Sequence, residues 1–254
     1  MTRGVSPAFA RCELQNLPRV GIDVERAERQ HLAYERALGD LGCTVVRLPA
    51  DPALPDCVFI EDTALVLDEV AVLLRPGAPS RRAETPAVAA ALASYRDLVV
   101  IGDPGTVDGG DVLRIGRDLF VGCSTRSNAV GIGQLAFAVA PFGYRVVPVP
   151  LTGCLHLKSA ATQVGPDALL VNRGWVDPEP FGKVRLVDVD PAEPHAANAL
   201  WLGDAVVHPA AFPRTRERVE ALGARVVAVD VSELQKAEGA VTCCCLVLEV
   251  PTGG

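Results

Sequence analysis

Several features that mark common classes of protein are missing from this chain of 254 residues. No apolar run approaches the roughly 20 residues needed to cross a bilayer, and the first residues lack the long apolar stretch of an export signal. Basic residues do not dominate either, because the formal net charge is −7, which argues against nucleic acid as a partner. We therefore expect a cytoplasmic protein that binds neither nucleic acid nor a membrane.

The spacing of cysteines and histidines also lacks the pattern of a structural zinc site. Eight cysteines and four histidines are present, but no two cysteines form a CxxC pair and the histidines are dispersed. In a chain of this size without an export signal, the cysteines are poor evidence for a disulfide framework. We therefore expect no metal and no other cofactor.

What the chain does contain is a degenerate repeat. Segments rich in β-branched residues predict strands at 44–49, 98–102, 144–150, 184–190 and 224–230. Helical patterns precede several of them, at 23–41, 85–95, 127–140 and 213–222. A polar or glycine-containing turn and further short apolar segments follow most of these strands. The unit therefore contains three strands and a helix, and it recurs about every 40 to 55 residues.

Different polar residues stand at equivalent places in successive repeats. They are Glu61 and Asp62, then Asp108 and Asp111, then His156, then Asn198, and finally Cys243. In a ring of repeats the equivalent ends of the units converge on one axis, so these side chains would meet there. The alternative is a doubly wound α/β sheet, but it would need a GxGxxG motif between a strand and a helix, which does not occur.

Three carboxylates surround the short apolar segment 58–60. Asp56, Glu61 and Asp62 are costly to bring together unless a cation lies between them. A guanidinium would suit them, because its planar fork donates hydrogen bonds in pairs to carboxylates. Taken alone, this segment is more simply interpreted as a strand with solvated ends, and Asp108 in TVDGGD as part of an ordinary turn.

Two segments carry candidate catalytic groups in predicted strands. His156 lies in LHLKS at strand spacing, so its imidazole would point away from the flanking leucines, although a lone histidine there is more often a core residue. In TCCC, alternation would place Cys243 and Cys245 on one face. Cys243 is the best candidate nucleophile because it is nearest the preceding loop and solvent. The alternative is that buried cysteines serve as small apolar residues.

Taken together, these segments resemble the dimethylarginine dimethylaminohydrolase family, which belongs to the guanidine-modifying superfamily with the pentein fold. The matching stretches follow the family's order and include DVERAERQH (23–31), LPDCVFIED (54–62), RPGAPSRR (75–82), TVDGGD (106–111), GCSTRSNAVG (122–131), LHLKS (155–159), AAN (196–198), PRTRE (213–217), SELQKAEG (232–239) and VTCC (241–244). The resemblance implies a five-bladed pseudo-symmetric α/β propeller, with strand-strand-strand-helix units around a central active site. It also implies a single catalytic domain over residues 1–254.

The resemblance assigns roles to the acidic residues. Asp56 looks like the acid that meets the α-amino group of the substrate. Glu61 and Asp62 resemble residues that line the pocket, with Asp62 holding the guanidinium. Asp108 resembles the second carboxylate on the guanidinium and belongs to the catalytic group.

Four further positions match the family outside this acidic set. Arg81 and Arg126 resemble the pair that holds the α-carboxylate, a task that suits bidentate arginines. Leu14 lies in the segment similar to the family's mobile lid. Ala237 occupies a position whose backbone contacts the substrate.

His156 and Cys243 match the catalytic pair, and the implied reaction is hydrolysis of an N-methylated arginine to citrulline and a methylamine. Cys243 would attack the guanidinium carbon, and His156 would first protonate the leaving amine and then activate water against the S-alkylthiouronium. Two alternatives stay open: an arginine deiminase that acts on free arginine, and a non-catalytic protein that binds cationic amino acids. The partner in each case is a small molecule, and the sequence leaves open a homodimer.

Overall fold

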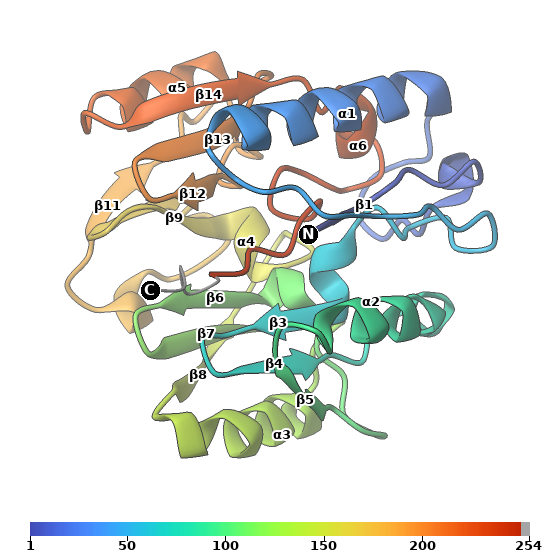
Figure 1. Cartoon of the computed structure of the whole chain (residues 1–254). Helices are drawn as coiled ribbons and strands as arrows, with labels where there is room; N and C mark the ends of the chain where they lie inside the picture. The colour runs from blue at the N-terminus through green and yellow to red at the C-terminus, as the bar shows by residue number, and fades with distance from the viewer. Residues whose placement is uncertain (250–254) are drawn as a thin grey trace.

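The chain folds into a ring of five small β-sheets, as the computed structural model shows for residues 1–249 (Figure 1). Four of the sheets contain three strands each. In these units the first two strands pair antiparallel, and the third pairs parallel with the second after a helical connection. This arrangement confirms the five-bladed α/β propeller that the sequence predicts.

The strands of these four units are short and follow one another in chain order. They are β3 (Ala64–Val66), β4 (Val70–Leu73) and β5 (Asp97–Val100); β6 (Val112–Ile115), β7 (Asp118–Cys123) and β8 (Arg145–Pro150); β9 (Ala161–Gly165), β10 (Ala168–Val171) and β11 (Arg185–Asp188); β12 (Leu200–Leu202), β13 (Ala205–Pro209) and β14 (Arg225–Val229). The connecting helices are α2 (Thr85–Leu92), α3 (Ala129–Val139) and α5 (Pro213–Glu220), and a single 3₁₀ turn, η6 (Glu179–Phe181), replaces the helix in the third unit.

The fifth unit is built from both ends of the chain. Its parallel strands β1 (Thr2–Arg3) and β2 (Arg47–Leu48) are connected through α1 (Val24–Asp40). The C-terminal segment completes it, because the Leu246 N–H donates to the Met1 carbonyl at 2.8 Å and the Met1 amino group donates to the Leu246 carbonyl at 2.6 Å. The ring is therefore closed by backbone contacts between opposite ends of the chain.

Helix α1 begins where the sequence predicts. The Asp23 carboxylate accepts a hydrogen bond from the Arg26 N–H at 2.9 Å, which caps the first turn. Its buried face includes Tyr34 and Leu38, which pack in the core cluster that also contains Phe59. A short helix, α6 (Ser232–Gln235), precedes the C-terminal segment and packs against α1. The capped, amphipathic pattern of this region was thus sufficient to locate it.

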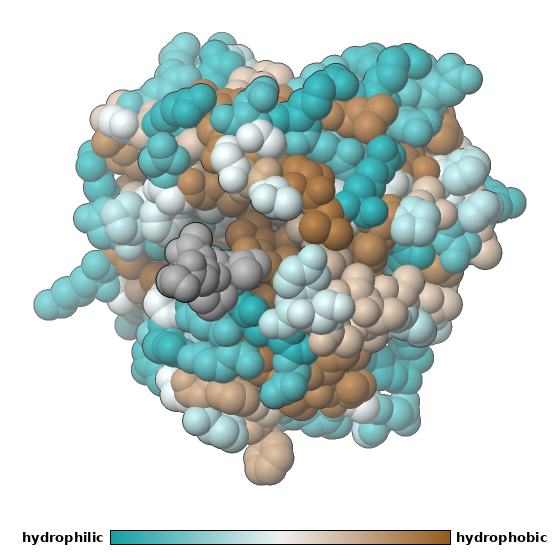
Figure 2. Space-filling model, in the orientation of Figure 1, coloured by the Kyte–Doolittle hydropathy of each residue, from teal (hydrophilic) through white to brown (hydrophobic). Residues whose placement is uncertain are grey.

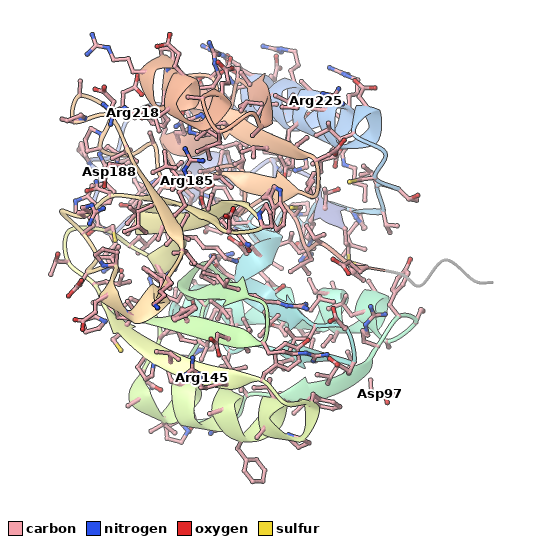
Figure 3. The ribbon with its side chains drawn as sticks, turned by 90° about the vertical axis from the view of Figure 1, so that its left-hand side faces the viewer. Asp97, Arg145, Arg185, Asp188, Arg218 and Arg225 are labelled. Atoms are coloured by element: carbon pink, nitrogen blue, oxygen red, sulfur yellow. The ribbon has the colours of Figure 1, made fainter. Side chains whose placement is uncertain are left out.

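The middle and outer strands of the sheets differ in exposure. All residues of β4, β10 and β13 are buried, which suits their sequences, apolar throughout except for His208 in β13. The edge strands β5, β8, β11 and β14 each begin with an exposed charged residue, respectively Asp97, Arg145, Arg185 and Arg225 (Figure 3). Such charges hinder pairing between the edges of separate molecules.

The surface also has separate hydrophilic and apolar regions. Figure 2 shows hydrophilic residues over most of the rim of one face, with apolar residues gathered near its middle. Among residues 1–249, no helix combines the length and apolar character needed to span a membrane.

Three segments that the sequence predicts as strands have other structures. Residues 60–63 form the 3₁₀ helix η2 (Ile60–Thr63), residues 157–160 form the short helix α4 (Leu157–Ala160), and residues 241–249 contain turns and irregular chain. In these segments, hydrogen bonds to polar groups favour turns over the strands that the alternation of apolar residues predicts. The Thr63 hydroxyl donates to the Ile60 carbonyl, and the Leu157 N–H donates to the Asp111 carboxylate. The predictions that His156 and Cys243 each occupy one face of a strand are therefore wrong.

Candidate active site

Residues from several units of the ring converge on a narrow cavity at its centre. Its lining comprises Glu13, Asp56, Phe59, Asp62, Arg81, Arg126, Leu155, His156, Ala237, Glu238, Gly239 and Cys243. Seven of the ten site residues predicted from the sequence are in this group. The other three are Leu14 and Glu61, which each follow or precede a lining residue in the chain, and Asp108, which contacts the lining residue His156.

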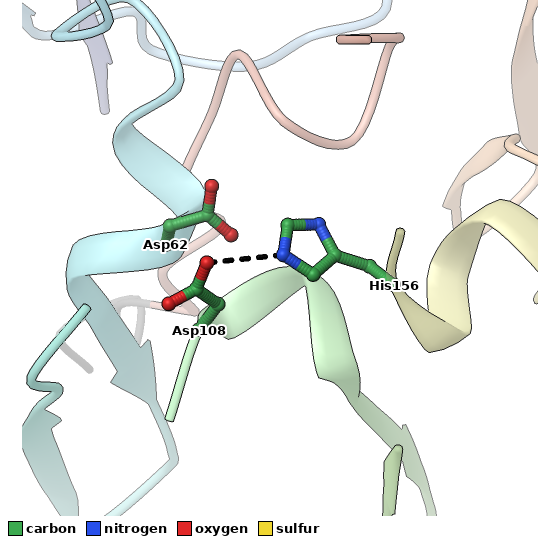
Figure 4. A group of neighbouring side chains, drawn as sticks. All are labelled: Asp62, Asp108 and His156. Atoms are coloured by element: carbon green, nitrogen blue, oxygen red, sulfur yellow. Dashed lines mark hydrogen bonds and ion pairs between the residues drawn. The ribbon is translucent and has the colours of Figure 1, made fainter. Parts of the chain in front are cut away.

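Asp108 reaches the site through His156. The His156 Nε2 atom lies 3.0 Å from the Asp108 Oδ2 atom, and Asp62 lies beside them (Figure 4). The other Asp108 oxygen accepts the Gly77 N–H at 2.7 Å, which fixes the carboxylate. The imidazole packs directly on Gly110, where a Cβ atom would lie 2.6 Å from Nδ1. Gly110 thus makes room for the histidine, while Gly109 allows the close approach of the Glu61 backbone.

The carboxylates keep His156 charged. Burial alone would lower its pKa, but the Asp62 charge and the hydrogen bond to Asp108 outweigh burial and raise the pKa of His156 to about 9. The same interaction acts on Asp62, where burial is outweighed by His156 and Arg81 and the pKa falls to about 2. At neutral pH the site therefore holds an imidazolium beside an ionised carboxylate.

Asp62, Asp108 and His156 are also the one set in the described part of the chain with metal-binding potential. Their donor atoms all lie within 4.8 Å of one another. Two carboxylates facing one small space suit the planar N–H groups of a guanidinium equally well.

Cys243 is half-buried at the wall of the same cavity. Its sulfur accepts the Ala240 N–H at 3.4 Å. Burial, together with the charges of Glu61 and Asp62, raises the pKa of the Cys243 thiol well above its ordinary value. A cation placed against these carboxylates would oppose that effect and favour the thiolate, which is the nucleophilic form.

The two predicted arginines are already bound to acidic groups of the protein. The buried Arg81 guanidinium donates to Asp62 at 2.5 Å, to Glu84 at 2.8 Å and to the Phe59 carbonyl at 2.9 Å. Arg126 donates from Nε to the Gln15 side chain at 3.1 Å, and its Nη1 lies 3.8 Å from Asp108. Both guanidinium groups thus stand at the cavity wall with fixed orientation.

Asp56 and Leu14 connect the cavity to an exposed segment, residues 13–21. Both carboxylate oxygens of Asp56 accept the Glu13 N–H, at 3.2 and 3.1 Å. Burial raises the pKa of Asp56, while Arg81 acts in the opposite direction. Leu14 packs on the core cluster that contains Phe59, and the rest of the segment has no helix or strand. This segment, called the lid segment below, contributes Glu13 to the wall of the cavity.

Glu61 points away from the cavity. Its oxygens accept hydrogen bonds from the Lys158 ammonium at 2.6 Å and from the Thr242 hydroxyl at 2.9 Å. Its backbone N–H donates to the Cys243 carbonyl at 3.2 Å. Glu61 therefore supports the segment that carries the nucleophile rather than lining the cavity.

Replacing Lys158 with methionine should destabilise the fold strongly. The buried Glu61 carboxylate would lose its cation, and the free energy of unfolding should fall by about 3–5 kcal/mol, measured by urea denaturation. Adding Glu61→Gln should restore most of this loss, because the uncompensated charge is then removed. A double variant as unstable as the single one would contradict this explanation.

Asp111, which the repeat places among the central polar residues, is fully buried. Its carboxylate accepts hydrogen bonds from the hydroxyls of Ser124 and Ser127 at 2.5 and 2.6 Å, and from the Leu157 N–H at 3.0 Å. Burial raises the pKa of Asp111 to about 6. Asp111 thus connects the loop on both sides of Arg126 to the helix after His156. Its position in the GGD turn is the sequence feature that could have indicated this role.

Comparisons with known proteins agree with this geometry. The chain is 36% identical to N(G),N(G)-dimethylarginine dimethylaminohydrolase of Pseudomonas aeruginosa over 87% of its own length and 88% of the relative's. It is 41% identical to the enzyme of the same name from Streptomyces coelicolor, over 96% and 94%. A solved structure of the Pseudomonas protein, a cysteine-to-serine variant complexed with citrulline, superposes with a TM-score of 0.91 at 33% identity and 96% coverage of both chains. No family model matches the chain.

Proposed function

The chain belongs to the dimethylarginine dimethylaminohydrolase family, and from this membership we infer that it hydrolyses N-methylated arginine to citrulline and a methylamine. The observation that carries the inference is the meeting of Cys243, His156 and Asp62 in one cavity, with the Asp108 carboxylate 3.0 Å from His156. A thiol, a proton donor and acceptors for guanidinium N–H groups are the parts that this hydrolysis needs.

Substrate recognition divides between the two ends of the amino acid. Asp62 and Asp108 accept N–H groups of the substrate guanidinium and fix its plane against the Cys243 sulfur. Arg126 and Arg81 hold the α-carboxylate, and Asp56 with the backbone at Ala237 receives the α-amino group. Five of these residues line one cavity, which supports their roles. Asp108 is supported by its proximity to them, because its carboxylate lies within 4.8 Å of donor atoms of Asp62 and His156.

The reaction proceeds in two steps through a covalent intermediate. The Cys243 thiolate attacks the guanidinium carbon, and the C–N bond to the methylated nitrogen breaks as His156 donates its proton to the leaving amine. The neutral imidazole then takes a proton from water, whose oxygen attacks the S-alkylthiouronium carbon. The C–S bond then breaks, the second water proton passes to solvent as the carbonyl of citrulline forms, and the thiolate is regenerated.

Space beside the nucleophile supports a methylated substrate over free arginine. A second, wider cavity shares Leu155 and Cys243 with the first, and its walls include Trp175 and Phe212. Apolar walls of this kind favour methyl groups over the hydrated N–H groups of unmodified arginine.

Citrulline formation from asymmetric dimethylarginine, monomethylarginine and arginine tests the proposal directly. We expect kcat/KM to be at least about tenfold higher for a methylated substrate than for arginine, since one methyl group in an apolar pocket gives a factor of about 10 or more. Equal or faster turnover of arginine would instead identify an arginine deiminase.

We propose further that residues 1–254 form one catalytic domain and that the partner is a small molecule, not nucleic acid, in keeping with the net charge of −7. All eight cysteines are free thiols, which supports a reducing compartment and hence the cytoplasm.

The oligomeric state is a separate question. Light scattering after size-exclusion chromatography will distinguish a monomer from a homodimer.

A further inference from the structure

Glu238 holds the lid segment by its backbone. Its carboxylate accepts three N–H groups of consecutive residues, from Gln15 at 2.8 Å, Asn16 at 2.6 Å and Leu17 at 2.8 Å. Glu238 is separated from these residues by more than 200 positions in the sequence, and it also lines the cavity that contains Cys243. One side chain thus joins the lid to the loop that leads to the nucleophile.

The backbone of Glu238 has an unfavourable conformation for its residue type. Its φ angle is 59°, in the left-handed region that favours glycine, and no other non-glycine residue among those described has a positive φ. The next residue cannot exchange with it, because a Cβ atom at Gly239 would overlap the Phe59 ring. A carboxylate side chain kept at a strained position, with three donors aimed at it, indicates a function for that carboxylate.

The segment held in this way also touches groups that we assign to substrate binding. Gln15 accepts from Arg126 Nε at 3.1 Å and donates to the Thr125 hydroxyl at 2.6 Å. Glu13 donates its N–H to Asp56 and accepts from the Ser80 hydroxyl at 2.5 Å. The lid segment therefore contacts Asp56 and Arg126 through Glu13 and Gln15. Glu238 binds the same segment from another part of the chain, so movement of the segment would affect both sets of contacts.

We propose that Glu238 is a positioning residue, the latch that keeps residues 15–17 closed over bound substrate. The proposal rests on the proposed function for the identity of that substrate. A carboxylate accepts N–H groups more strongly than a neutral oxygen does, so the charge as well as the shape of the side chain matters. Because the latch acts after the substrate has entered, its loss should weaken retention of substrate much more than it slows the chemical step.

Limited trypsin digestion measures the latch without any turnover. Arg19 and Arg11 are exposed in and beside the lid, so cleavage after them reports its opening. We expect Glu238→Ala to be cut about tenfold faster there than the parent, and Glu238→Gln by an intermediate factor, because cleavage follows the population of the open form. Glu25→Ala, which removes an exposed carboxylate of α1, should leave the rate unchanged.

Glu238→Gly separates the latch from a purely structural role. Glycine relieves the backbone strain, so a structural role predicts normal lid cleavage and a thermal stability at least equal to that of the parent. The latch predicts fast cleavage in this variant as well. Parent-like cleavage in Glu238→Ala and Glu238→Gly would overturn the proposal.

Steady-state kinetics give a second, independent readout. In Glu238→Ala we expect KM for methylarginine to rise about tenfold while kcat stays within about threefold. A fall in kcat with unchanged KM and unchanged cleavage would overturn the latch. If no methylarginine were turned over by the parent but the difference in cleavage persisted, the proposed function would fail and the latch would stand.

Discussion

Cys243→Ser should abolish citrulline formation, with a fall in kcat of about 10⁴-fold or more, while the affinity for methylarginine is largely retained. A serine hydroxyl is a far weaker nucleophile than a thiolate, and loss of the nucleophile in enzymes of this kind removes almost all turnover. Binding persists because Asp62, Asp108 and Arg126 are untouched by the change. Citrulline assays measure the first effect and isothermal calorimetry the second.

A matched control separates the nucleophile from the other thiols. Cys123 is exposed and lies outside the cavity, so Cys123→Ser should keep full activity. An electrophilic amidine should label the parent and Cys123→Ser but not Cys243→Ser. Turnover of Cys243→Ser within tenfold of the parent would favour the non-catalytic binding protein.

His156→Ala should lower kcat by about 10³-fold, in the range that a positioned general acid and base contributes. Hydrolysis of the thiouronium should slow more than its formation, because a basic leaving amine can take its proton from solvent. A covalent adduct on Cys243 should then accumulate, and mass spectrometry of the intact protein would detect it. Full activity without adduct would show that another group transfers the protons.

The pH dependence of the parent enzyme follows from the same side chain. With a pKa of about 9, His156 is protonated at neutral pH and loses its proton as the pH rises through 9. The general acid is then missing, so kcat should decline above about pH 9. The pH profile of His156→Ala should lack this alkaline decline. The raised pKa also means that the charged histidine stabilises the fold fully below about pH 6.5 and that this contribution disappears above pH 9.

The parts of the fold that could be predicted are those governed by local pattern. The capped amphipathic helix after Asp23 and the β-branched third strands of the repeats were identified correctly, because periodicity and caps are properties of neighbouring residues. The repeat then implied that Asp108 and His156 meet, and they lie 3.0 Å apart. Convergence of equivalent positions was thus a sufficient argument for the centre of the site.

The parts that could not be predicted depend on contacts between distant residues. The Glu61 carboxylate pairs with Lys158, which comes from a different unit of the ring, instead of facing the cavity. The residues next to Glu61 in the sequence carry no information about this distant partner. The lid anchor at Glu238 joins two irregular segments, which have no periodicity to indicate it. The segment around Cys243 contains apolar residues at every position from 243 to 248, yet hydrogen bonds through Thr242 and Glu61 hold it in turns instead of a strand.

Closure of the ring by Met1 and Leu246, 245 residues apart, has a consequence for the folding of the enzyme. Contacts this distant in sequence form late, because the entropy of a long loop must be overcome before they contribute. The groups of the site are distributed from Glu13 to Cys243, so an intermediate with only some blades formed holds an incomplete set. Catalytic activity therefore reports the last stage of folding, and recovery of turnover after dilution from denaturant should lag behind recovery of secondary structure.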